Sequence, residues 1–128
     1  MMAVILVVED SLTVSTAVQG MLCKHGYTVR VAGDGLVALS ALRTFQPDLV
    51  LLDIRLPHVD GYQLCHVIRR QSKYQHLPIV MLSGLSGADD MQRALEAGAD
   101  DYLVKPVDEK ILLATVEMHL VQAEIRTG

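Results

Sequence analysis

Five side chains that could bind a cation or a phosphoryl group stand directly after apolar segments of the sequence. Glu9 and Asp10 follow the first such segment, Asp53 follows a later one, and Ser83 and Lys105 follow two more. The three carboxylates would repel one another at short range unless a cation joined them or their pKa values rose. A hard cation resolves that conflict, and Mg²⁺ suits a set of carboxylates, water and a phosphate.

This combination of residue types predicts phosphoryl transfer. A metal ion and a lysine neutralise charge on the transferring group, and positioning does most of the catalysis. A carboxylate is an adequate nucleophile for phosphorus, and the product of its attack is an aspartyl phosphate. Asp53 is the best candidate, because the apolar run before it, residues 49–52, is typical of a central strand buried on both faces.

The elements expected to position these side chains alternate between strand and helix along the whole chain. The expected strands cover residues 3–8, 27–32, 48–52, 78–82 and 101–104, and the expected helices cover residues 11–25, 36–45, 61–73, 87–97 and 108 to about 125. This pattern predicts one α/β domain over residues 1–128, a doubly wound (βα)5 fold with a five-stranded parallel sheet. Ligands of such sheets bind at the carboxyl ends of the strands, so the polar residues should gather there.

The composition limits the classes of protein to which the chain can belong. The 128 residues are 51% hydrophobic and 20% charged, which indicates one globular domain. A net charge of −4 provides no basic surface for nucleic acid or an anionic membrane. We find no apolar run of membrane-spanning length and no signal peptide. Cys23 and Cys65 lie in helical patterns and are expected to be small buried apolar side chains, so a cytoplasmic location is expected.

Four segments together resemble the receiver domain of two-component response regulators, and the resemblance covers essentially the whole chain. They are ILVVED (5–10), LVLLDIRLPHVDG (49–61), IVMLSG (79–84) and AGADDYLVKP (97–106). The resemblance implies a flavodoxin-like sheet with strand order 2-1-3-4-5. It also implies a signalling switch that accepts a phosphoryl group from a sensor histidine kinase or a phosphotransfer protein. Its phosphotransfer and autodephosphorylation would be self-catalysed, so we do not expect a conventional enzyme.

The resemblance also implies which residues would hold the metal ion. Asp10 and Asp53 would bind Mg²⁺ directly, Glu9 would act mostly through water, and the main-chain carbonyl of Arg55 would complete the protein ligands. No cofactor other than Mg²⁺ is expected.

The remaining site residues carry expected roles in phosphoryl binding and switching. By the same resemblance, Ser83 and Lys105 contact the phosphoryl oxygens, and the bond between Lys105 and Pro106 is cis. Phosphorylation would draw Ser83 toward the phosphate, and Tyr102 would then turn inward. Such a change is a two-state switch biased by local electrostatics.

Several of these residues also have simpler structural explanations. Asp10 alone could cap the helix expected from residue 11. Asp60, with Gln63 three residues later, matches a capping box and is assigned to structure. Arg69 and Arg70 lie at the end of a predicted helix, where their charge favours the helix C-terminus and is expected to do nothing more. The five histidines show no ligand spacing.

Three other functions would each fit part of this sequence pattern. Haloacid-dehalogenase-like phosphatases need a second aspartate two residues after the nucleophile, where this sequence has Arg55. A flavodoxin-like FMN site would use the hydroxyls of residues 11–16, but Glu9 and Asp10 would repel its phosphate. A degenerate receiver that only binds proteins would normally lack part of the acid, serine and lysine set, which is complete here.

Two further hypotheses concern the surface. Arg55, which follows Asp53 by two residues, and Leu85, which follows Ser83 by two, could set the lifetime of the phosphorylated state by controlling charge and water. The last helix is apolar on more than one face, which suggests a homodimer or partner surface, a continuation into an output domain, or scattered surface residues. Its apolar residues include Ile111, Leu112, Leu113, Val116, Leu120 and Val121.

Overall fold

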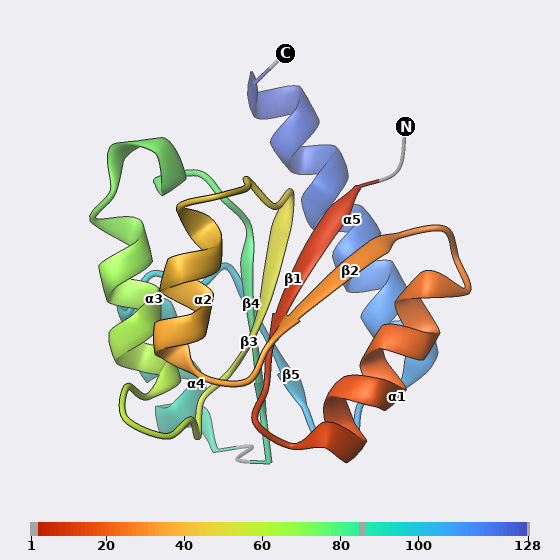
Figure 1. Cartoon of the computed structure of the whole chain (residues 1–128), viewed down its shortest axis with the longest axis horizontal. Helices are drawn as coiled ribbons and strands as arrows, with labels where there is room; N and C mark the ends of the chain where they lie inside the picture. The colour runs from red at the N-terminus through yellow and green to blue at the C-terminus, as the bar shows by residue number, and fades with distance from the viewer. Residues whose placement is uncertain (1–2, 85–86, 128) are drawn as a thin grey trace.

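The computed structural model describes residues 3–84 and 87–127 and contains one parallel sheet flanked by helices (Figure 1). The strands are β1 (Val4–Val8), β2 (Thr28–Ala32), β3 (Leu49–Asp53), β4 (Ile79–Ser83) and β5 (Asp101–Val104). The helices are α1 (Leu12–Cys23), α2 (Gly35–Leu42), α3 (Gly61–Arg69), α4 (Ala88–Glu96) and α5 (Glu109–Thr127), with a 3-10 helix η1 (Ser72–Tyr74). The strand order is β2-β1-β3-β4-β5, which confirms the predicted doubly wound α/β fold.

Helices cover both faces of the sheet (Figure 1). Helices α1 and α5 pack on one face, while α2, α3 and α4 pack on the other. Strand β3 contributes to both cores, because Leu51 faces the α1 and α5 side and Leu52 faces the opposite side. All five residues of β3 are buried, as expected of the central strand of a sheet covered on both faces.

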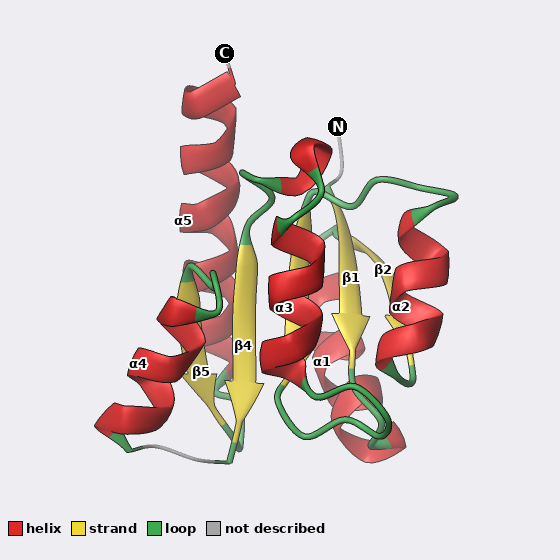
Figure 2. Cartoon of the chain, turned by 90° about the vertical axis from the view of Figure 1, so that its left-hand side faces the viewer, coloured by secondary structure: helices red, strands yellow, loops and turns green. Residues whose placement is uncertain are grey.

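The carboxyl ends of the central strands lie at one edge of the sheet (Figure 2). Val8 in β1 pairs with Leu52 in β3, Asp53 pairs with Leu82 in β4, and Ser83 pairs with Val104 in β5. Asp53 and Ser83 are the last residues of their strands, one position further than predicted. Both side chains are therefore held by the hydrogen-bonded sheet.

Local capping residues begin two of the helices, and the cap at Asp60 was predicted from the sequence. Asp34 accepts a hydrogen bond from the backbone nitrogen of Val37 at 2.8 Å, which caps α2. Asp60 and Gln63 form both hydrogen bonds of a capping box at the start of α3. Each cap supplies acceptors for backbone N–H groups that have no partner within the helix.

Helix α3 is shorter than predicted, because tertiary contacts reorganise its end. It stops at Arg69, and η1 follows. The phenolic group of Tyr74 in η1 donates a hydrogen bond to the carbonyl of Leu42 at 2.8 Å, at the end of α2. The predicted helix ended at residue 73, just before Tyr74. In the structure Tyr74 is almost fully buried and belongs to the core.

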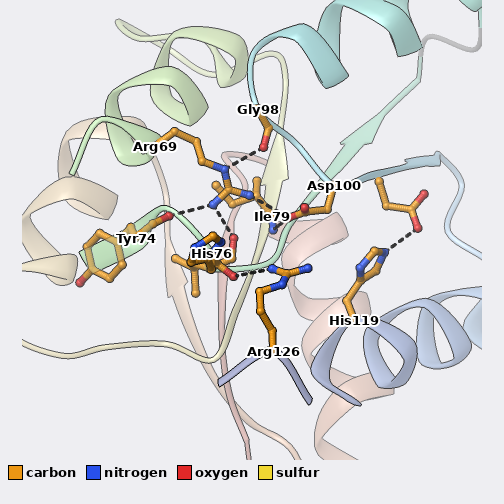
Figure 3. A network of polar contacts seen from close by, with 10 residues as sticks. Arg69, Tyr74, His76, Ile79, Gly98, Asp100, His119 and Arg126 are labelled. Carbon is orange, nitrogen blue, oxygen red and sulfur yellow. Dashed lines mark hydrogen bonds and ion pairs between the residues drawn. The ribbon is translucent and has the colours of Figure 1, made fainter. Parts of the chain in front are cut away.

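The limited role predicted for Arg69 is wrong, because its guanidinium joins three segments of the chain (Figure 3). Its nitrogens donate to the carbonyls of Tyr74, Leu77 and Gly98 at 2.8, 2.6 and 2.8 Å. The same group pairs with Asp100 at 2.7 Å, and Asp100 also accepts from the backbone nitrogen of Ile79. These contacts connect α3, η1 and the starts of β4 and β5.

None of the helices described by the structure is long and apolar enough to cross a membrane. Cys23 and Cys65 are both free. Cys65 is buried, but Cys23, the last residue of α1, is exposed, so the prediction that both are buried is wrong for Cys23. Burial raises the pKa of the Cys65 thiol to about 11. Cys65 therefore packs as a neutral apolar side chain, as predicted.

Candidate functional site

A pocket of about 360 Å³ lies at the carboxyl ends of β1, β3, β4 and β5. It gathers the catalytic and metal-ligating candidates that were identified from the sequence. Its lining residues are Glu9, Asp10, Ser11, Asp53, Arg55, Ser83, Gly84 and Lys105. The topology brings these residues together, because four parallel strands end at this edge.

Three carboxylates converge in this pocket. Glu9, Asp10 and Asp53 each offer an oxygen, and these three oxygens lie within 4.8 Å of one another. Glu9 and Asp53 are buried, while Asp10 is exposed. One oxygen of Glu9 accepts from the backbone nitrogen of Ser11 at 3.1 Å. Two buried charges and one open carboxylate suit a hard cation that approaches from solvent and keeps some of its water.

Lys105 supplies the positive charge of this cluster. Its Nζ lies 2.5 Å from Oε1 of Glu9 and 3.2 Å from Oδ1 of Asp53. Burial alone would lower the pKa of Lys105, but the hydrogen bond to Glu9 and the charge of Asp53 outweigh it. The pKa of Lys105 therefore lies above its ordinary value, and the ammonium stays charged.

The simple charge sum of the cluster favours a divalent cation. Three carboxylates and one ammonium give a formal charge of −3 + 1 = −2. The donor set consists of oxygen atoms, which Mg²⁺ prefers over nitrogen and sulfur. Glu9, Asp10 and Asp53 therefore fit a magnesium ion by both charge and ligand chemistry.

Asp10 is not the cap of the first helix. Ser11 occupies that position, and its hydroxyl accepts a hydrogen bond from the backbone nitrogen of Val14 at 3.3 Å. The structural alternative for Asp10 is thereby removed, and its exposed carboxylate faces the pocket shared with Asp53.

The backbone holds Asp53 in position on both sides. The nitrogen of Ile54 donates to the carbonyl of Leu82 in β4 at 3.2 Å, which extends the sheet pairing past Asp53. The nitrogen of Gly61 donates to the carbonyl of Ile54 at 2.7 Å. A Cβ atom at Gly61 would lie 2.4 Å from the carbonyl oxygen of Asp53, so only glycine permits this approach. Sequence reasoning assigned Gly61 only to the helix start and missed this contact.

Arg55 lines the pocket with an exposed side chain, and its backbone nitrogen donates to Oδ1 of Asp53 at 3.4 Å. This position fits the hypothesis that Arg55 influences the lifetime of a phosphorylated state, which stays a prediction. Leu85, the second residue of that hypothesis, lies outside the described residues.

The candidate switch residues lie on β4, on β5 and directly after β5. Ser83 is buried, and its carbonyl accepts from the backbone nitrogen of Lys105 at 2.7 Å. The bond between Lys105 and Pro106 is cis, which confirms the expected geometry. Tyr102 is half-buried and packs against the core on the side of α2, α3 and α4.

Comparisons with known proteins agree with this geometry. Residues 5–117 match the family model of the response regulator receiver domain. This chain belongs to the response regulator receiver domain family. Family membership decides against the haloacid-dehalogenase-like and FMN-binding alternatives.

Receiver domains with similar sequences and structures come from diverse bacteria. DNA-binding response regulator MtrA of Mycobacterium tuberculosis H37Rv is 42% identical over 116 residues, which are 91% of this chain and 50% of that protein. A putative response regulator from Chloroflexus aurantiacus is 35% identical with a TM-score of 0.92, covering 94% of this chain and 99% of the other. Chemotaxis response regulator CheY4 of Vibrio cholerae is 32% identical with a TM-score of 0.89, covering 93% and 99%.

This receiver domain spans about half the length of the curated relatives it matches. Response regulators are signalling proteins of two-component systems, so the chain is a signalling domain.

Proposed function

We propose that this receiver domain is a phosphorylation-dependent switch that accepts a phosphoryl group on Asp53. The donor would be the phosphohistidine of a sensor histidine kinase or of a phosphotransfer protein. The observation that carries this proposal is the position of Asp53, the last residue of the buried strand β3, beside Lys105 and two further carboxylates. A fixed carboxylate in a pocket open to solvent suits a nucleophile that must meet a partner's phosphorylated side chain.

The transfer would exchange one bond for another. An oxygen of Asp53 attacks the phosphorus, the bond between phosphorus and imidazole nitrogen breaks, and the imidazole keeps the electron pair. The Nζ of Lys105 lies 3.2 Å from Oδ1 of Asp53. After the transfer, Lys105 would pair with the negatively charged phosphoryl oxygens. The hydroxyl of Ser83 would donate to another of these oxygens.

Magnesium would be held by Glu9, Asp10 and Asp53, with the carbonyl of Arg55 as a further ligand. Bound Mg²⁺ supplies charge neutralisation of the transferring phosphoryl group. The three convergent carboxylates and their net charge support this assignment. Glu9 shares its Oε1 with Lys105, which agrees with a weaker role for Glu9 that acts through water.

The reaction would change Asp53 itself rather than turn over a substrate. Loss of the phosphoryl group would follow attack by water, so both steps are self-catalysed and no conventional enzyme activity is proposed. Arg55 stands where a phosphatase of the haloacid-dehalogenase type carries its acid, and arginine cannot act as a general acid or base at neutral pH.

Phosphorylation would change the conformation of residues in β4 and β5. Movement of Ser83 toward the phosphate would let Tyr102 turn inward, toward Tyr62. Burial raises the pKa of Tyr62, and neighbouring Tyr102 adds to this effect, which supports the closeness of the two rings. The Arg93 guanidinium of α4 stacks over Tyr62 at 4.2 Å, so a change at Tyr102 would be transmitted to α4.

The partner of the switched surface would be an output domain or a second copy of this chain. Curated relatives named as DNA-binding regulators are about twice as long as this chain, which supports an output domain in a longer protein. Nucleic-acid binding would then belong to that domain, since this chain carries a net charge of −4.

The proposal is tested by the intact mass of the protein after incubation with phosphoramidate and Mg²⁺. We expect one phosphoryl adduct on the wild type and none on Asp53→Asn. An adduct on both proteins would show that another side chain is the acceptor. No adduct on wild type, even with a histidine kinase and ATP, would favour a receiver that only binds proteins.

A further inference from the structure

Strand β5 carries Tyr102 at the edge of the sheet, where β4 is its only neighbouring strand among the described residues. The strand has four residues, Asp101–Val104, and pairing on one side alone restrains such a short strand weakly. Contacts from outside the sheet therefore decide how firmly the backbone around Tyr102 is fixed. Helices on both faces of the sheet supply such contacts at the start of β5.

Two consecutive aspartates join the start of β5 to helices on opposite faces of the sheet (Figure 3). Asp100 pairs with Arg69 of α3, with 2.7 Å between the carboxylate oxygen and the guanidinium nitrogen. Asp101 pairs with His119 of α5, with 2.8 Å between Oδ2 and Nε2. Neighbouring residues of an extended chain point their side chains to opposite sides, so one pair lies on each face. The chain is thus held from both faces directly before Tyr102.

The pair between Asp101 and His119 reaches the backbone of Tyr102 itself. His119 is only 8% exposed, and a buried polar ring needs a hydrogen-bond partner. An ionised carboxylate only accepts hydrogen bonds, so Nε2 of His119 donates to Oδ2 of Asp101. The second oxygen of Asp101, Oδ1, accepts from the backbone nitrogen of Tyr102 at 2.8 Å. One carboxylate therefore connects α5 to the backbone of Tyr102.

The other end of β5 is joined to the candidate phosphorylation site. The backbone nitrogen of Lys105, directly after β5, donates to the carbonyl of Ser83 at 2.7 Å. A movement of Ser83 toward a phosphoryl group would displace this end of the strand. Tyr102 lies between the displaced end and the end that His119 holds. Displacement of the Tyr102 backbone would therefore stretch its hydrogen bond to Asp101.

We propose that His119 is a positioning residue that holds Tyr102 in its resting orientation by fixing Asp101. This inference rests on the function proposed above, since it concerns the switch that phosphorylation of Asp53 would operate. A contact shifts an equilibrium between two states only when its free energy differs between them. The hydrogen bond from Tyr102 to Asp101 is formed in the resting structure and is weakened when Tyr102 turns inward. His119 thus opposes the inward turn until phosphorylation displaces the other end of β5.

Fluorine NMR of protein labelled with 3-fluorotyrosine measures the two orientations of Tyr102. The Tyr102 signal is identified by its absence from Tyr102→Phe, and incubation with phosphoramidate and Mg²⁺ supplies the phosphorylated reference. Before phosphorylation, the ratio of inward to outward Tyr102 should be about tenfold higher in His119→Leu than in wild type, because a hydrogen bond to a charged group contributes about that factor. Asp101→Asn removes the charge from the same pair and should raise the ratio in the same direction, so the test does not depend on one variant.

Two further variants distinguish this role from general support of α5. His119→Gln keeps an N–H donor near the position of Nε2 and should restore most of the wild-type ratio. Lys24→Met removes the pair with Glu109 that joins α5 to α1, without touching β5, and should keep the wild-type ratio. A wild-type ratio in His119→Leu would overturn the proposal. So would a rise in Lys24→Met or His119→Gln as large as that in His119→Leu.

The intact mass of the same samples separates failure of this inference from failure of the proposed function. A phosphoryl adduct on wild type, together with an unchanged Tyr102 ratio in His119→Leu, would overturn only the role of His119. No adduct on wild type would contradict phosphorylation of Asp53, and the inference would be overturned with it. An adduct that leaves the Tyr102 signal of wild type unchanged would overturn both the switching role of Tyr102 and the positioning role of His119.

Discussion

At the scale of single residues, Lys105 supplies the positive charge in a site that contains three carboxylates. Lys105 pairs with Glu9 at 2.5 Å and with Asp53 at 3.2 Å, and its own side chain is only 22% exposed. Among the described residues, Lys105 is the cation that pairs with the buried carboxylate of Glu9, so its removal would leave this carboxylate without an ion-pair partner. The same ammonium is therefore a structural counter-ion in the resting protein and the proposed partner of the phosphoryl oxygens.

Lys105→Met should destabilise the metal-free protein by about 1–3 kcal/mol at pH 7, because it leaves buried carboxylates unpaired. The raised pKa of Lys105 sets the pH dependence. The contribution of Lys105 to the free energy of unfolding is fully present below its unfolded pKa of about 10.4. This contribution is lost as pH rises through the higher pKa of Lys105 in the folded protein. Urea unfolding from pH 7 to 11 in EDTA measures the free energy of unfolding of wild type and variant. The difference between these two free energies should shrink only above about pH 10.5.

The control for this prediction is Lys24→Met. Lys24 pairs with Glu109 at 3.0 Å, but both side chains are open to solvent. Its removal should change the free energy of unfolding by less than about 1 kcal/mol. Equal losses in the two variants would contradict the role given to Lys105.

At the scale of secondary-structure elements, contacts at the two ends of α3 stabilise the site at one edge of the sheet and the strand starts at the opposite edge. Gly61 lets the first turn of α3 approach the carbonyl of Asp53, so the helix supports the strand end that carries the proposed nucleophile. Arg69, at the other end of α3, joins η1, β4 and the loop before β5. Helix α3 is thus anchored at both ends by contacts that involve backbone atoms.

Gly61→Ala should destabilise the protein by more than about 2 kcal/mol, since the new Cβ would lie 2.4 Å from the carbonyl oxygen of Asp53. The variant should also accept the phosphoryl group more slowly. The control is Gly20→Ala in α1, where nothing lies within 4 Å of the new Cβ. That change should stabilise the helix by up to about 1 kcal/mol. Thermal unfolding should show a lower melting temperature than wild type for Gly61→Ala and a higher one for Gly20→Ala.

Arg69→Met should cost about 2–4 kcal/mol of unfolding free energy, because it removes the donors of three backbone carbonyls and the partner of Asp100. The neighbouring exposed Arg70 provides the control, and Arg70→Met should change stability by less than about 0.5 kcal/mol. Similar denaturant midpoints for both variants would mean that the network in Figure 3 contributes little.

At the scale of the whole molecule, folding gathers charges of one sign that come from distant parts of the chain. Glu9 and Asp10 lie at the end of β1, and Asp53 lies at the end of β3. Their repulsion opposes folding, and a bound divalent cation would turn it into attraction. Stability should therefore depend on Mg²⁺ concentration, because on this proposal the ion would bind the folded chain and not the unfolded one.

Added Mg²⁺ should raise the melting temperature of wild type, with a stabilisation of about 2.7 kcal/mol at a hundred times the dissociation constant. Asp10→Asn should have two effects of opposite sign. It should stabilise the metal-free protein by removing one repelling charge, and it should abolish most of the gain from Mg²⁺. Glu96→Gln, at an exposed position of α4, should respond to Mg²⁺ like wild type. Calorimetry with and without Mg²⁺ distinguishes these cases.

Much of this architecture was predictable from local sequence patterns. Apolar runs such as residues 49–52 identify strands, Asp34 and Asp60 identify helix starts, and the alternation of both elements implies a parallel sheet. Since parallel strands present their carboxyl ends at one edge, the gathering of Glu9, Asp53 and Lys105 followed from their places after those runs. Strand ends and caps are properties of a few neighbouring residues, so they are readable without the fold.

Other features depend on contacts between residues that are far apart in the chain. Lys105 bonds to Glu9 across 96 positions, and Tyr74 reaches the end of α2 across 32. Arg69 looked like an ordinary basic helix end, because its four acceptors come together only when η1 and the start of β5 pack beside α3. The approach of Gly61 to Asp53 arises in the same way, from the angle at which the helix returns to the strand. Packing selects these partners among many that the local sequence permits, so only the folded chain identifies them.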